Sequence, residues 1–135
     1  MLTRVLLIFT LAISVGSYCT QAQDDGIITF WGDKDFKGEK WQFHRTLEPQ
    51  YCYNDNVGKP SSITWKNQIT TGDFNGKSKI GFFTEHDCTG AVLTWFTTKD
   101  GFPRDLEMDS INNQIKSFML LQTSLFPDVI VRDAA

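Results

Sequence analysis

Two stretches of the chain, "FWGDKDFKG" at residues 30–38 and "FFTEHDCTG" at residues 82–90, match each other at a fixed offset of 52 residues. A stretch that recurs in this way usually marks one structural unit that is used twice. The repeat therefore predicts a fold built from two similar halves. The matching pairs are Phe30 with Phe82, Trp31 with Phe83, Asp33 with Glu85, Asp35 with Asp87, and Gly38 with Gly90.

The beginning of the chain, residues 1–22, has the pattern of a secretory signal peptide. Arg4 supplies a positive charge, an apolar run occupies residues 5–15, and small or polar residues lead to a cleavage site after Ala22. The apolar run is too short to cross a membrane as a helix. We therefore expect a secreted, extracellular protein; a buried N-terminal strand or helix is the alternative.

Charge limits the partners that the mature chain would bind. Removal of residues 1–22 leaves 12 basic and 16 acidic residues, a net charge of −4. An acidic chain without a basic cluster is poorly suited to bind nucleic acid, or to bind an anionic membrane by charge alone. We expect the partner to be an extracellular protein, a glycan or a membrane.

Cleavage also changes the cysteine count. It removes Cys19 and leaves Cys52 and Cys88 as a pair in an oxidising compartment. Such a pair favours a disulfide, which would stabilise the fold by roughly 3–4 kcal/mol in the chain-entropy description. Two separate buried thiols are the alternative, and cleavage after Ser17 would instead leave Cys19 as an odd thiol.

Runs of β-branched and aromatic residues, separated by turn residues, dominate the mature chain. Several alternate with polar residues; Trp41 and Phe43 do so, and so do Ile63 and Trp65. Short strands with frequent turns predict an all-β sandwich or barrel. The predicted strands lie at residues 27–31, 40–44, 62–66, 79–84, 91–96 and 115–121.

The repeat extends beyond the opening stretch. Trp41 aligns with Leu93, Phe43 aligns with Trp95, and Ser62 pairs with Ser117 at an offset of 55 residues. Two units of about four strands each, too small to bury a core alone, are expected to pack face to face. The predicted boundaries are a domain at 23–121, with motif one at about 27–66, a linker at 67–77 and motif two at about 78–121, followed by a tail at 122–135. The tail is predicted either to add an edge strand, to dock a partner, or to fray.

These motifs resemble a βγ-crystallin domain, a β-sandwich of two Greek-key motifs. The hairpin pattern aromatic–x–acid–x–x–aromatic–x–Gly is matched at residues 31–38, and again at 83–90 with Cys88 replacing the second aromatic. The resemblance covers roughly residues 27–121. It implies a two-sheet sandwich of two four-stranded motifs, in which the third strand of each motif joins the sheet of the other. Cys52 and the Cys88 hairpin would then share a sheet.

The resemblance also implies calcium binding, through a loop of the form Asn/Asp–Asn/Asp–x–x–Ser/Thr–Ser in each motif. Calcium prefers oxygen ligands of this kind. The first loop, 57–62, keeps the hydroxyls but lacks the Asn/Asp pair, and the second, 112–117, keeps the pair but has Lys116 at a hydroxyl position. The ammonium group of Lys116 is a candidate substitute for the cation, and a metal-free domain is the favoured interpretation. The candidate ligands of one weak calcium site are Ser61, Asn113 and Gln114.

No group of residues in the sequence points to an enzyme. His44 lies on the polar side of a predicted strand and His86 lies in a hairpin turn, and the motifs of metalloproteases, serine hydrolases and phosphate loops are absent. Of the tryptophans, most are expected in the core rather than on a sugar-stacking face. We expect a non-enzymatic module with a structural or binding role. The alternative is a secreted effector, such as a toxin or venom component, an antimicrobial protein or a protease inhibitor, with residues 47–54 as its contact loop.

Overall fold

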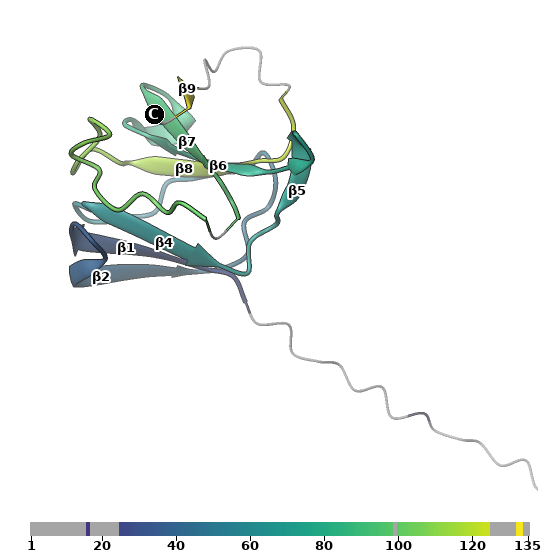
Figure 1. Cartoon of the computed structure of the whole chain (residues 1–135), viewed down its shortest axis with the longest axis horizontal. Coiled ribbons are helices and arrows are strands. Elements are labelled where there is room, and N and C mark those ends of the chain that lie inside the picture. Colours follow the sequence, from purple (N-terminus) through teal and green to yellow (C-terminus); the bar gives the residue numbers. More distant parts are fainter. Residues whose placement is uncertain (1–15, 17–24, 99, 125–131, 134–135) are drawn as a thin grey trace, which may run out of the picture.

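Figure 1 shows the computed structural model of the protein, which describes residues 16, 25–98, 100–124 and 132–133. Two layers of β-sheet face each other. The first sheet has the order β2-β1-β4, and the second has the order β3-β8-β6-β7-β9. Apart from residue 16, the predicted signal peptide at 1–22 lies outside the described residues.

The all-β prediction is confirmed, and each of the six predicted strands is present. Neighbouring strands are antiparallel, except that β9 lies parallel to β7. The strands of the two sheets are β1 (Ile27–Asp33), β2 (Lys37–His44), β3 (Cys52–Tyr53), β4 (Ser62–Lys66), β6 (Lys79–Phe83), β7 (Val92–Phe96), β8 (Ser117–Leu121) and β9 (Arg132–Asp133).

The strand register repeats between the halves as the sequence offsets predict. The two strand partners of Phe82 lie 52 and 55 residues after the corresponding partners of Phe30. Phe30 lies opposite Trp41 and Ile63, and Phe82 lies opposite Leu93 and Phe118.

The core lies between the two sheets and is rich in aromatic side chains. The ring centroid of Phe30 is 6.0 Å from that of Phe82 and 5.5 Å from that of Phe118, so the central residues of both sheets meet directly. Trp65 is 5% exposed, and its indole N–H donates to the carbonyl oxygen of Thr97. Burial of such rings is the main source of stability in a sandwich of this size.

Each half lends its third segment to the sheet of the other half. β3 pairs with β8, where Cys52 lies opposite Met119. In the second half, residues 102–106 are not a regular strand, but their backbone bonds to the region of β4. The amide of Ile63 donates to the carbonyl of Pro103 at 2.9 Å, and the amide of Leu106 donates to the carbonyl of Ser61 at 2.8 Å.

The paired stretches 30–38 and 82–90 fold into two hairpins of the same shape. A serine hydroxyl closes each: Ser62 accepts from the amide of Phe36 and donates to the carbonyl of Asp33, and Ser117 makes the equivalent bonds to Cys88 and Glu85. The positive φ angles recur at Asp35 (58°), Phe36 (59°) and Gly38 (81°), and at Asp87 (60°), Cys88 (54°) and Gly90 (80°). Glycine is favoured at the end of each hairpin because a Cβ atom would lie 2.5 Å from a carboxylate oxygen of Asp33 at Gly38 and 2.7 Å from the hydroxyl oxygen of Thr84 at Gly90.

The predicted linker, residues 67–77, contains a strand that the sequence did not reveal. β5 (Thr71–Phe74) bridges back to Lys77 through a turn in which Asn75 and Gly76 have positive φ. β5 belongs to neither sheet, so its sequence lacks the run of buried apolar residues that marks the strands of the core. The linker is therefore a small hairpin rather than an irregular connection.

The predicted tail, residues 122–135, adds an edge strand where it is described. β9 lies beside β7, with Arg132 opposite Leu93 and Asp133 opposite Thr94. Residues 125–131 lie outside the described part of the chain.

Within the described ranges, no helix is both long and apolar enough to span a membrane.

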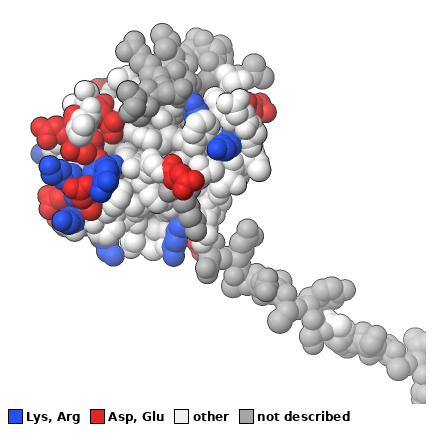
Figure 2. Space-filling view, in the orientation of Figure 1, with Lys and Arg blue, Asp and Glu red and all other residues white. Residues whose placement is uncertain are grey.

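Charged side chains of both signs gather at one end of the face in Figure 2, the end where the β1–β2 hairpin lies in Figure 1. Each hairpin takes part in one of two ion pairs. Arg104 of the second half pairs with Asp35 in the first hairpin at 2.9 Å, and Lys116 pairs with Glu85 within the second half at 3.1 Å. These pairs are exposed, so each is expected to contribute about 0–1 kcal/mol.

Candidate functional site

A disulfide joins Cys52 to Cys88, with 5.9 Å between their Cα atoms, so the predicted pairing is confirmed. It ties β3, which comes from the first half, to the hairpin of the second half. Next to it, the side-chain amide of Asn54 donates to the carboxylate of Asp87 and accepts from its backbone amide. The segment that follows β3 is therefore anchored covalently and by two hydrogen bonds.

The loop that contains Cys52, residues 47–54, is held in place along its length. The amide of Glu48 donates to the hydroxyl of Tyr53, and the amide of Gln50 donates to the carbonyl of Leu120 at 2.9 Å. Tyr51 stands out from this frame, since it is 56% exposed while its ring contacts that of Tyr53. The loop thus presents one aromatic side chain to solvent.

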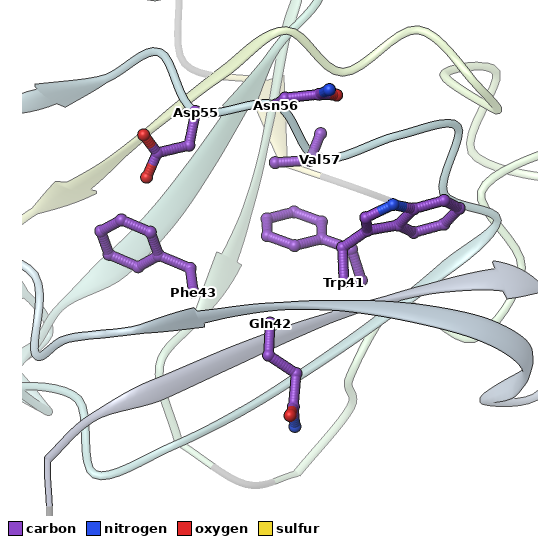
Figure 3. Close-up of a pocket in the computed structure, with 7 residues that line it drawn as sticks. Trp41, Gln42, Phe43, Asp55, Asn56 and Val57 are labelled. Atoms are coloured by element: carbon purple, nitrogen blue, oxygen red, sulfur yellow. The ribbon is translucent and has the colours of Figure 1, made fainter.

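A crevice of about 300 Å³ opens between β2 and residues 55–57 (Figure 3). Trp41 and Phe43 point from β2 toward the 55–57 segment, while Gln42 points to the other side of the strand. Its floor is aromatic because alternate residues of a strand face the same side. The residues that line it are Phe30, Trp41, Gln42, Phe43, Asp55, Asn56 and Val57.

The wall opposite β2 is fixed by its own residues. Val57 is 3% exposed and belongs to the core, and the side-chain oxygen of Asn56 accepts from the amide of Gly58. Gly58 has a φ of +67°, and a Cβ atom there would lie 2.5 Å from the Trp41 ring. Only glycine lets the backbone lie so close to the indole, so this contact holds one side of the crevice.

A second crevice, of about 490 Å³, continues from the first. It shares Phe43 and Asp55 with the first crevice and has a more polar lining. The disulfide and the exposed Tyr51 form part of its wall. Its lining residues are Phe43, His44, Arg45, Tyr51, Cys52, Tyr53, Asn54 and Asp55.

Asp55 is the one charged residue that lines the first crevice. Its side chain is exposed, and Figure 3 places its carboxylate on the Phe43 side of the 55–57 segment. Within the described part of the chain, this carboxylate makes no hydrogen bond and no ion pair. The crevice therefore combines aromatic rings with one carboxylate that no described residue pairs with.

The calcium positions that the resemblance implies fit a cation only in part. At one, Lys116 donates to the carboxylate of Glu85 at 3.1 Å, so an ammonium already pairs with the acid of the hairpin. This position does not fit a second cation, because like charges would meet there.

The other position offers neutral oxygens. The amide of Asn113 donates to the carbonyl of Pro60, which brings it beside Ser61, and the side-chain oxygen of Asn112 is buried without a hydrogen-bond partner. Gln114 is exposed. Such oxygens fit calcium, but affinity falls when carboxylates are few. Ser61, Asn113 and Gln114 as ligands, and Lys116 as a cation substitute, stay predictions.

Both histidines are exposed. His44 lies at the end of β2 in the first sheet, and His86 lies in the hairpin between β6 and β7 of the second sheet. Among the described residues, no three His, Cys, Asp or Glu side chains group so that they could hold a metal ion. Trp31 has one side near the ammonium of Lys40 and donates to the hydroxyl of Thr64, so its position does not favour a sugar-stacking face. The absence of catalysis stays a prediction.

No model of a known protein family matches the chain, and no curated protein matches it in sequence.

Sequence reasoning found part of this site and missed the rest. It selected the 47–54 loop but stopped before Asp55, and it placed Trp41 and Phe43 in the core. Both are half-buried and pack against the core, yet they also line the crevice. The available signal was the "DNVG" stretch at 55–58, but only the crossing of β3 to the other sheet places it over β2.

Proposed function

We propose that the chain is a secreted, non-enzymatic module that acts by binding another extracellular molecule in the crevice between β2 and residues 55–57. The observation that carries this proposal is the crevice itself. It is a hollow with an aromatic floor and a carboxylate that pairs with none of the described residues, and a disulfide-anchored segment forms its wall. Binding sites commonly combine an apolar lining with a few polar groups in this way.

Several features support secretion and a βγ-crystallin-like, Greek-key arrangement. The Cys52–Cys88 disulfide suits an oxidising compartment. The matched hairpins and the exchange of third segments between the sheets are what the resemblance implies. Because folds of one kind host many activities, the binding role rests on the crevice and not on the resemblance.

The test uses the full chain, expressed through a secretory pathway and recovered in oxidised form. Its ¹H–¹⁵N spectrum is recorded with four probes in turn: Nα-acetyl-lysine methylamide, acetate, N-acetylglucosamine and phosphatidylcholine vesicles. We expect at least one probe to shift the Trp41 indole signal and the amides of residues 55–58. If none of them moves these signals, a purely structural role is the better account.

A second candidate is a secreted effector, such as a protease inhibitor, that uses residues 47–54. The observation that favours it is the rigid loop with Tyr51 exposed at its surface. Inhibitors of this kind present a preorganised loop. If this candidate holds, Tyr51→Ala abolishes inhibition of a secreted protease without lowering the melting temperature; if the unchanged protein inhibits no protease in a broad panel, it is rejected.

A further inference from the structure

We propose, on the basis of the binding function above, that the first crevice receives the ammonium-bearing side chain of a lysine from a partner protein. Two groups would hold it. The first is the pair of aromatic rings that line the crevice, Phe43 and the Trp41 indole, which packs one side against Gly58 and would offer the other to the cation. The second is the carboxylate of Asp55, which supplies the opposite charge.

The protein already shows this chemistry elsewhere in its fold. The ammonium of Lys79 lies 5.0 Å from the ring centroid of Phe74 and 4.8 Å from that of Phe96, and that of Lys40 lies 5.7 Å from Trp31. Neither Trp41 nor Phe43 has such a cation among the described residues. The crevice thus has the aromatic component of this contact and a counter-charge, but lacks the cation.

The polar groups of the crevice favour a cation over a sugar. A sugar needs several hydrogen-bonding side chains around it, but Gln42 points away from the crevice and donates to Thr29. The side-chain oxygen of Asn56 is occupied by the amide of Gly58. Asp55 is left as the main polar group, which suits a ligand with an apolar stem and one charged tip.

The second crevice favours a protein as the source of this lysine. It continues from the first at Phe43 and Asp55, so residues that flank the lysine in a partner chain have a surface to lie on. Arg45 lines this second crevice and would repel another positive charge. We therefore expect an isolated lysine rather than a polybasic segment.

The test measures binding of Nα-acetyl-lysine methylamide to the oxidised full chain, through the shift of the Trp41 indole signal. The norleucine analogue, which has the same stem without the charge, is the matched ligand. We expect the lysine compound to bind at least about fivefold more tightly than the norleucine compound. Asp55→Asn should weaken lysine binding about fivefold or more, while Asp73→Asn, an exposed carboxylate outside both crevices, should leave it unchanged.

Equal binding of the two analogues, or lysine binding unaffected by Asp55→Asn, would overturn the proposal. A shift of the Trp41 signal by N-acetylglucosamine but not by the lysine compound would also overturn it, yet would leave the proposed binding function standing. Choline binding tenfold tighter than the lysine compound would reject a protein lysine as the source of the cation. If no probe moves the signal, the proposed function falls as well. An unchanged spectrum away from residues 55–58 shows that the Asp55→Asn variant is folded.

Discussion

The two hairpins of the molecule share one backbone shape but are held by different chemistry. The first is tied to the third segment of the second half, by ring contact between Phe36 and Phe102 at 6.4 Å and by the pair of Arg104 with Asp35. The second is tied to the third segment of the first half, by the Cys52–Cys88 disulfide. The backbone topology is the same for both hairpins, so the difference in how strongly each is attached comes from the side chains.

The edge strands differ in a way that concerns function. β7 has β9 beside it, but β2 has no strand on its outer side within the described residues. The covalent attachment lies in the segment that also forms the wall of the crevice over β2. The crevice thus lies between an open edge strand and a segment that the disulfide anchors, which favours a rigid site there.

Removal of the disulfide is expected to have the largest effect on stability. The chain-entropy relation for a separation of 36 residues gives a loss of roughly 3–4 kcal/mol in the free energy of unfolding for Cys52→Ala with Cys88→Ala. Urea denaturation monitored by tryptophan fluorescence measures it. Arg104→Ala, which breaks only an exposed pair of the other hairpin, should lose about 0–1 kcal/mol. Equal losses of unfolding free energy for the double cysteine variant and for Arg104→Ala would show that the two hairpins are not attached with different strength.

The hairpin serines should rank next. Ser62→Ala and Ser117→Ala each remove a buried hydroxyl that bonds two backbone groups, so each should lower the free energy of unfolding by about 1–3 kcal/mol. Ser124→Ala, at an exposed position, is the control and should be neutral. A neutral result at only one of the two buried serines would break the equivalence of the hairpins.

Calcium should distinguish the two loops by a smaller effect. We expect millimolar calcium to raise the melting temperature of the unchanged protein only slightly. Lys116→Ser frees the Glu85 carboxylate and restores a hydroxyl, so calcium should stabilise this variant more than it stabilises the unchanged protein. The gain in the free energy of unfolding should reach about 1.4 kcal/mol when free calcium is ten times the dissociation constant. Lys66→Ser, an exposed lysine on β4, is the control. A response of Lys116→Ser no larger than that of the control would show that Lys116 does not stand in for a cation.

The smallest effect on stability is expected from replacing Asp109, a half-buried acid that precedes the 112–117 loop in the sequence. Burial raises the pKa of this carboxyl, and the charge of Asp105 raises it further. A raised pKa in the folded state contributes stability below the unfolded pKa, and that contribution is lost as pH rises through the folded pKa. Asp109→Asn should therefore raise the melting temperature slightly at pH 7, with the gain shrinking in acid. A gain that is larger at pH 3 than at pH 7 would reverse this sign.

The sequence predicts the repeated parts of the fold well because they follow local rules. Alternation at Trp41 and Phe43 marks β2, and the glycines at 38 and 90 mark turns with a positive φ. The pair of cysteines that remains after removal of the predicted signal peptide predicts the disulfide. The segments that cross between sheets are harder to predict: β3 has only two residues, and residues 102–106 form no regular strand.

The crevice could not be predicted because it depends on that crossing. Asp55 and Trp41 are separated in sequence and meet only after β3 has joined β8. Nothing local distinguishes an aromatic residue that fills the core from one that also lines a hollow at its edge.

The most direct test of this account is the exchange of third segments, on which both the hairpin locks and the crevice depend. In the full-length oxidised protein, nuclear Overhauser effects should connect Cys52 with Met119, and Pro103 with Ile63. We expect both of these contacts between the halves. If each third segment instead contacts only the sheet of its own half, the exchange is wrong and the proposed crevice is lost with it.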